Sequence, residues 1–190
     1  MVLLTQLGIV LASYLLGCIS VGYYLVRWRT GQDLRELGSG ATGGRNTGRV
    51  LGKSGAIATG IGDILKGVIA MGIALWFNVE PWALALVMIA VLAGHVWPFQ
   101  LGFKGGKGLS AAFGAVLAFD YRIALLTAIL ALVLLLISRN EFLFLMGIAS
   151  SPPIAFALGH RWEIVAGMVV LVLIILYAHR GNIQGSLRSK

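Results

Sequence analysis

Long apolar runs separated by short polar segments dominate this chain. The runs fall at residues 2–26, 54–78, 81–98, 108–119, 122–138, 142–159 and 164–179. A transmembrane helix needs about 20 apolar residues to cross roughly 30 Å of hydrocarbon, and most of the runs come close to that length. The pattern therefore predicts an all-α integral membrane protein, a bundle of about seven transmembrane helices in which residues 1–190 form a single domain.

The fourth run decides the topology because it is the shortest. If all seven runs cross the membrane, the loops on the side of residues 27–53 carry twelve Lys and Arg residues, against two on the opposite side. If the run at 108–119 does not cross, the split becomes ten to four. Since Lys and Arg collect in cytoplasmic loops, the charges predict seven spans, with the N-terminus outside and the C-terminus inside.

Two of the runs contain residues that do not suit an uninterrupted apolar helix. Pro152 and Pro153 lie in the sixth run, and we expect them to kink it. Asp63 and Lys66 lie in the second run at a spacing that lets them pair on one helix face. Charges at membrane depth should face the bundle interior. The pair is therefore either a structural ion pair or part of the wall of a polar cavity.

Composition agrees with a membrane protein and limits the other classes. The chain is 58% hydrophobic and only 12% charged, whereas about a quarter of the residues of a soluble domain are charged. The net charge of +8 lies in loops between apolar runs, so it does not indicate nucleic-acid binding. Cys18 is the single cysteine, so it can form no intrachain disulfide, and we expect it to be a packing residue.

Three polar segments stand out, and in the seven-span topology all three face the cytoplasm. They are residues 38–49, 94–108 and 179–183. The first has a G-x-G-x-x-G spacing, which indicates a dinucleotide site only between a strand and a helix, and its neighbours here are membrane helices. The second lacks the spacing of a Walker A motif, because Leu101 stands where that motif needs glycine. Neither a dinucleotide fold nor nucleotide hydrolysis is expected.

These segments carry groups that suit anions. Glycines let backbone N–H groups approach an anion closely, Arg45 and Arg49 add charged donors, and a helix N-terminus expected near Leu109 favours negative charge. The alternative is flexible loops whose arginines serve topology alone. His95 and His179 stand near span ends, where an interfacial cap and a catalytic role are both open. The residues favour a phosphate and a lipid-like molecule as substrates, without separating synthesis from transport of an anion. A transporter usually shows repeated halves, which we do not find.

The three motifs resemble those of the bacterial acyl-phosphate:glycerol-3-phosphate acyltransferases, the PlsY family. Its members carry G-S-G-N-x-G-A-T-N-x-x-R, then G-H-x-x-P-x-F leading into F-K-G-G-K-G, and a C-terminal H-R-x-N-I. Residues 38–49, 94–108 and 179–183 align with these in order. Ala41 departs from the family Asn, and Gly44-Arg45 departs from Ala-Thr. The stretch 138–151 matches the family's serine-containing segment only weakly.

The resemblance implies transfer of a fatty acyl group from acyl phosphate to the 1-hydroxyl of glycerol 3-phosphate, without a cofactor or a metal. The products are lysophosphatidic acid and phosphate. The implied partners are these two substrates, the lipid bilayer and the enzyme that supplies acyl phosphate, and they include no nucleic acid. The implied location is the bacterial cytoplasmic (inner) membrane, which the protein crosses several times, with the active site on the cytoplasmic side.

The resemblance and the residue types together predict the site. The residues expected to be catalytic are Ser39, His95, His179 and Asn182. Those expected to bind substrate are Gly40, Arg45, Asn46, Arg49, Lys104, Gly105, Gly106 and Lys107. Asp63 and Lys66 are expected to form a structural polar pair. The general base is either one of the histidines, whose pKa suits neutral pH, or a phosphate of the substrate.

Overall fold

A computed structural model describes the backbone of residues 2–188 and the side chains up to residue 184, and this part of the chain is helical without strands. The elements are α1 Val2–Gly17, α2 Val21–Thr30, η1 Leu34–Glu36, α3 Gly44–Trp76, α4 Pro81–Val96, η2 Phe99–Leu101, α5 Leu109–Phe119, α6 Tyr121–Ser138, α7 Glu141–Ile148, α8 Ser151–Ala157, α9 Trp162–Ala178 and α10 Arg180–Arg188. The predicted all-α class is confirmed.

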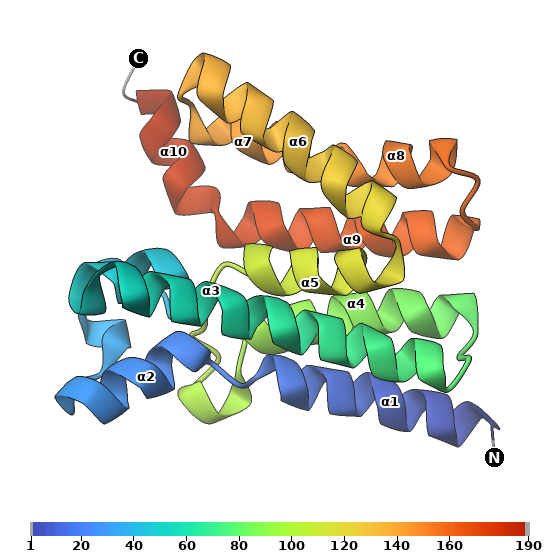
Figure 1. Cartoon of the computed structure of the whole chain (residues 1–190), viewed down its shortest axis with the longest axis horizontal. Helices are drawn as coiled ribbons and strands as arrows, with labels where there is room; N and C mark the ends of the chain where they lie inside the picture. Colours follow the sequence, from blue (N-terminus) through green and yellow to red (C-terminus); the bar gives the residue numbers. More distant parts are fainter. Residues whose placement is uncertain (1, 189–190) are drawn as a thin grey trace.

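The apolar segments run back and forth between the same two ends of the molecule (Figure 1). Within residues 2–188, four helical segments are long and apolar enough to cross a membrane: Val2–Thr30, Gly44–Trp76, Pro81–Leu101 and Tyr121–Ser138. Three shorter apolar segments accompany them: Leu109–Phe119, Glu141–Ala157 and Trp162–Ala178. Large apolar side chains such as Leu4, Ile137 and Leu173 face outward, as they do where lipid is the solvent.

The first apolar run, expected as one span over residues 2–26, is broken between α1 and α2. The break exposes backbone carbonyls that a continuous helix would use, and side chains from other segments bind them. Lys66 Nζ donates to Gly17 O at 3.0 Å and to Ile19 O at 2.9 Å, and Gln100 Nε2 donates to Cys18 O at 2.6 Å. The break is therefore stable because each freed carbonyl has a donor.

The sixth run is also broken rather than kinked. α7 ends at Ile148 and α8 starts at Ser151, so Pro152 and Pro153 fall in the first turn of a new helix. Proline is tolerated there because the first N–H groups of a helix have no partner within it. The polar segment 38–49, which was expected to be a loop, is only partly one. Helix α3 begins at Gly44, so residues 44–49 are helical.

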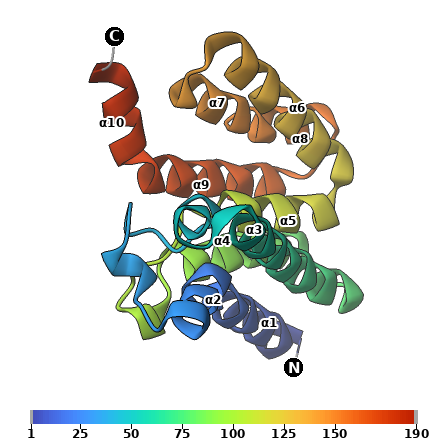
Figure 2. The same cartoon turned by 60° about the vertical axis from the view of Figure 1, so that its left-hand side comes forward.

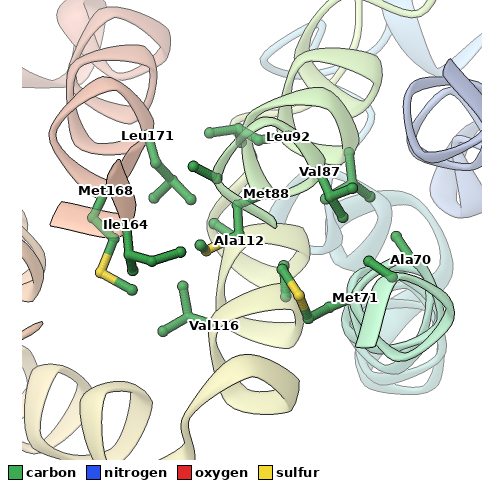
Figure 3. Close-up of a cluster of buried hydrophobic side chains, with 14 of the residues drawn as sticks. Ala70, Met71, Val87, Met88, Leu92, Ala112, Val116, Ile164, Met168 and Leu171 are labelled. Carbon is green, nitrogen blue, oxygen red and sulfur yellow. The ribbon is translucent and has the colours of Figure 1, made fainter. Parts of the chain in front are cut away.

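The core forms where α3, α4, α5 and α9 meet. Met71, Met88, Val116 and Met168 gather there, one from each of these helices (Figure 3). α9 separates this group from the α6–α8 layer in both whole-chain views (Figure 2).

Glycines let the helix backbones come close, as is common in membrane bundles. A Cβ at Gly67 of α3 would lie 2.2 Å from Ala111 O of α5.

α5 is only half as long as a membrane span. Its 11 residues extend over about 16 Å, and α2 and the start of α3 reach well beyond its first turn toward the same end of the molecule (Figure 1). The N-terminus of α5 therefore lies inside the bundle, next to the loop that leads to it. This position creates the polar cavity described next.

Candidate active site

The loop before α3 is held together by one buried asparagine. Asn46 is 2% exposed, and its Nδ2 donates to Leu34 O at 3.2 Å, Leu37 O at 2.9 Å and Ala41 O at 3.0 Å. Its Oδ1 accepts a hydrogen bond from Ser39 N at 3.0 Å. All these groups are satisfied within the protein, so Asn46 shapes the loop. The sequence-based role of Asn46 as a substrate ligand stays a prediction.

The second loop, residues 102–108, packs on the end of α4 through its glycines. Gly105 N donates to Val96 O and Gly106 N donates to His95 O, each at 3.1 Å. A Cβ at Gly106 would lie 2.1 Å from His95 Nε2, so only glycine fits. Both N–H groups are used within the protein, and the glycines allow the loop to lie against His95. That Gly105 and Gly106 contact substrate stays a prediction.

A cavity of about 280 Å³ opens where the three predicted segments meet. Its walls come from the loop before α3, the start of α5, the ends of α4, α6 and α9, and the beginnings of α7 and α10. The lining residues are Ser39, Ala41, Gly43, Arg45, Asp63, His95, Lys107, Gly108, Leu109, Ser110, Leu135, Glu141, Phe144, Leu145, His179 and Asn182. Gly40, Gly105 and Gly106 line an adjoining hollow of about 300 Å³, which shares Ser39, Ala41 and Lys107 with it.

Two predicted basic residues stay outside these cavities. Lys104 and Arg49 are exposed, and neither lines the cavity or the adjoining hollow. Lys107 lies in the wall of both. Burial lowers the pKa of Lys107 most, and the charges of Arg45 and Arg49 act in the same direction while Glu141 opposes them. Such a crowded ammonium group gains by binding an anion.

The start of α5 adds backbone donors to the same wall. Gly108, the N-cap, has φ 85°, and helix α5 begins at Leu109 as the sequence predicted. Gly108, Leu109 and Ser110 all line the cavity. The first N–H groups of a helix have no intrahelical partner and carry partial positive charge. The wall beside Lys107 is therefore suited to an anion.

A carboxylate that the sequence analysis did not single out lies among the cationic groups. Glu141 forms an ion pair with Arg45 and accepts a hydrogen bond from Asn182 Nδ2 at 2.5 Å. Lys107 Nζ donates to Asn182 Oδ1, also at 2.5 Å. Glu141 is the first residue of α7 and follows Asn140, which caps that helix. In the sequence, the only signal near Glu141 is the weak match of residues 138–151 to the serine-containing segment of the family.

His179 lines the cavity and has one of its two ring nitrogens bonded to the backbone. Its Nδ1 lies 2.8 Å from Ile175 O, and a carbonyl can only accept, so the ring proton is on Nδ1 and Nε2 is an acceptor in the neutral form. Burial lowers the pKa of His179 most, and Lys107 lowers it further, while the bond to Ile175 opposes them. The imidazole is therefore neutral near pH 7 and able to accept a proton.

His95 has a different environment, which it shares with the polar pair of α3. Its Nδ1 lies 3.4 Å from Asp63 Oδ1, and Lys66 Nζ lies 2.9 Å from the same oxygen. All three residues are at most 3% exposed. The predicted pair of Asp63 and Lys66 thus exists, but it is part of a group of three that includes His95. Among the described residues, no cluster of three His, Cys, Asp or Glu side chains could hold a metal ion.

The fold and the cavity define a helical integral membrane protein with a cation-lined site at one end of its bundle. The family model described as glycerol-3-phosphate acyltransferase matches residues 7–189. A glycerol-3-phosphate acyltransferase 1 of Desulfitobacterium hafniense (strain Y51) is 44% identical over 181 residues, 94% of this chain and 89% of that protein. A glycerol-3-phosphate acyltransferase of Synechococcus sp. (strain CC9902) is 36% identical over 185 residues, 96% and 92% of the two chains.

Solved structures of PlsY (YgiH), an integral membrane glycerol 3-phosphate acyltransferase, share the fold. The glycerol 3-phosphate form superposes with a TM-score of 0.90 at 33% identity and covers 97% of this chain and 93% of that chain. The lysophosphatidic acid form gives a TM-score of 0.87 at 31% identity, with the same coverage. The chain belongs to the glycerol-3-phosphate acyltransferase family. It is therefore a membrane acyltransferase, which rules out the alternative of a non-enzymatic anion transporter.

Proposed function

We propose that this protein transfers a fatty acyl group from acyl phosphate to the 1-hydroxyl of glycerol 3-phosphate, giving lysophosphatidic acid and inorganic phosphate. The observation that carries the proposal is the meeting of Ser39, Lys107, His179 and Asn182, from the three separate polar segments, in one cavity. The related PlsY structures are described as glycerol 3-phosphate and lysophosphatidic acid forms, and these are an acceptor and a product of this reaction.

The phosphate groups of both substrates bind at the cationic wall. Lys107, Arg45 and the first N–H groups of α5 supply positive charge, and Asn182 and Ser39 supply neutral hydrogen bonds. Holding two phosphates in one cavity brings the hydroxyl oxygen close to the acyl carbonyl, which is a large part of the catalysis available here. The same donors stabilise the negative charge that develops on the carbonyl oxygen.

The acyl chain extends from this cavity along α5 into the apolar bundle. A smaller apolar pocket of about 50 Å³ lies there, lined by residues of α5, α6 and α9 together with Ile148 and Ser151, and it shares Leu109 with the cavity. Its lining is mostly alanine, leucine, isoleucine and valine. An alkyl chain placed there is removed from water without losing contact with the reacting carbonyl.

His179 is the protein base that we favour. In the step, the hydroxyl oxygen bonds to the acyl carbon, the carbon–oxygen bond to phosphate breaks, and the hydroxyl proton passes to His179 Nε2 and then to the departing phosphate. His95 is less suited, because its ring packs against Gly106 and Asp63. The remaining alternative is direct proton transfer to a phosphate of the substrate.

The topology that accompanies this function has seven spans in one domain, with the N-terminus outside and the C-terminus and cavity on the cytoplasmic side of a bacterial cytoplasmic membrane. The alternating course of the four long and three shorter apolar segments supports it (Figure 1). The excess of Lys and Arg in the loops on the cavity side supports it as well. We include the enzyme that produces acyl phosphate as a partner, because this substrate must be delivered to the membrane.

The test is an assay of the purified protein in detergent with acyl phosphate and glycerol 3-phosphate, following lysophosphatidic acid and released phosphate together. We expect equal amounts of both products, and none from acyl coenzyme A. Lys107→Ala should raise KM for glycerol 3-phosphate at least about tenfold, since a charged hydrogen bond is lost. Lys104 is exposed, so Lys104→Ala should change this KM little. Transfer from acyl coenzyme A alone, or equal effects of both variants, would contradict the proposal.

A further inference from the structure

Glu141 occupies the place where the proposed function puts a phosphate. Its two carboxylate oxygens bind the Arg45 guanidinium and the Asn182 amide, and Asn182 in turn accepts from Lys107. All four side chains line the same cavity. A carboxylate that accepts from a guanidinium and an amide makes the same kind of charge-assisted contacts as a phosphate oxygen. Glu141 thus already satisfies the donors that a substrate phosphate needs.

The carboxylate and a phosphate cannot both occupy the same donors. Arg45 and Lys107 are the two basic side chains, other than histidine, that line the cavity, and the second lining carboxylate, Asp63, is already paired with Lys66. A phosphate carries close to two negative charges near neutral pH, which matches them. With Glu141 still in place, a phosphate bound to Arg45 and Asn182 would lie at contact distance from the carboxylate, where like charges repel strongly. Binding of phosphate therefore requires Glu141 to release Arg45 and Asn182.

The structure allows that release with little other movement. Glu141 is the first residue of α7, but Asn140 supplies the helix cap, with its Oδ1 accepting from Phe142 N at 2.8 Å. The start of the helix therefore does not depend on the Glu141 side chain. The carboxylate side chain is 34% exposed and the Arg45 side chain is 70% exposed, so the carboxylate can rotate toward water.

We propose that Glu141 is a positioning residue that exchanges with the substrate phosphate: it holds Arg45 and Asn182 in the empty site, leaves when phosphate binds, and takes them back when inorganic phosphate departs. This inference rests on the proposed function. The exchange weakens phosphate binding and speeds release of the phosphate product. It also keeps two otherwise unpaired donors in position between turnovers.

The test compares wild type with Glu141→Gln, which keeps the shape and removes the charge. The Kd of inorganic phosphate, measured calorimetrically in detergent at about pH 8, should fall roughly three- to tenfold in Glu141→Gln, the range that loss of a competing charged contact allows. In turnover, KM for glycerol 3-phosphate should fall by a similar factor, and inhibition by inorganic phosphate should strengthen. Glu141→Asp, which keeps the charge, should restore both values toward wild type.

Glu163→Gln is the matched control, because Glu163 forms an ion pair with Arg161 at the opposite end of the bundle (Figure 1). It should leave the Kd of phosphate unchanged. A higher or unchanged Kd in Glu141→Gln would overturn the inference, and a higher Kd would mean that Glu141 helps to bind phosphate. The binding measurement needs no turnover, so its result does not depend on the proposed reaction. If acyl transfer failed but Glu141→Gln still bound phosphate more tightly, only the proposed function would be contradicted.

Discussion

At the scale of single residues, His179 is the cavity side chain with the clearest chemical capacity. Its bond to Ile175 O fixes the proton on Nδ1 and leaves Nε2 as an acceptor, on a residue that lines the cavity. The lowered pKa keeps the ring neutral. These two properties are what a general base needs, and neither depends on which acyl chain is transferred.

His179→Gln should lower kcat about 100-fold or more with little change in KM, because general base catalysis contributes roughly that much. The wild-type rate should be flat near neutral pH and fall as acid protonates the ring, with the midpoint below the usual value for histidine. Steady-state kinetics across pH measures both effects. A kcat within about threefold of wild type would instead assign the base to the substrate phosphate.

Residue types and the family resemblance together predicted part of this site. Ser39, Lys107, His179 and Asn182 were expected and lie together. Asn46, Gly105 and Gly106 were expected to bind substrate, but their polar groups are bonded within the protein. A sequence shows that a group can donate, but it does not show whether a neighbouring carbonyl already accepts.

Glu141 was not expected because nothing in its sequence neighbours links it to Arg45, 96 residues earlier. Only the fold brings the start of α7 to the start of α3.

At the scale of elements, the hydrophobic pattern located the helical segments but not their breaks. The run 2–26 reads as one span because hydropathy reports apolarity and not continuity of the helix. The break at residues 18–20 is stabilised by Lys66, which lies in a different run. Helix α5 was recognised as short, yet its burial against α3 depends on glycines whose neighbours the sequence does not identify.

Gly67 and Gly72 of α3 offer a matched test of this helix contact. A Cβ at Gly67 would lie 2.2 Å from Ala111 O and 2.7 Å from Ala115 N, both backbone atoms of α5, whereas a Cβ at Gly72 meets nothing within 4 Å. We expect Gly67→Ala to lower Tm in detergent by several degrees, since overpacking costs about 1–3 kcal/mol. Gly72→Ala should leave Tm unchanged or raise it, because alanine favours the helix.

The measurement is the Tm of both variants and of wild type, from thermal unfolding in detergent. Equal changes in Tm would mean that α3 and α5 do not meet at Gly67. Activity at a temperature well below Tm provides a second reading, because a shift of α5 also moves Leu109 and Ser110 in the cavity wall.

At the scale of the whole molecule, the position of the half-length helix α5 links fold and function. A full-length span would carry its N-terminus to the membrane surface, whereas α5 starts inside the bundle and directs its first N–H groups into the cavity. The polar loop 102–108 that leads to it is protected by its hydrogen bonds to His95 and Val96. Irregular backbone at membrane depth is tolerated only where it is covered by protein or lines a cavity.

The membrane topology depends on whether this short helix crosses, and cysteine labelling decides it. In a Cys18→Ala background, single cysteines replace Lys53, Tyr121 or Trp162, all of which are exposed. Seven spans place Tyr121 and Trp162 outside and Lys53 inside. A membrane-impermeant maleimide added to intact cells should therefore label Tyr121→Cys and Trp162→Cys. It should label Lys53→Cys only after the cells are permeabilised. If α5 does not cross, Tyr121→Cys and Trp162→Cys change sides and resist labelling until the membrane is opened. Asn78→Cys, in the exposed turn between α3 and α4, stays outside in both topologies and controls for access.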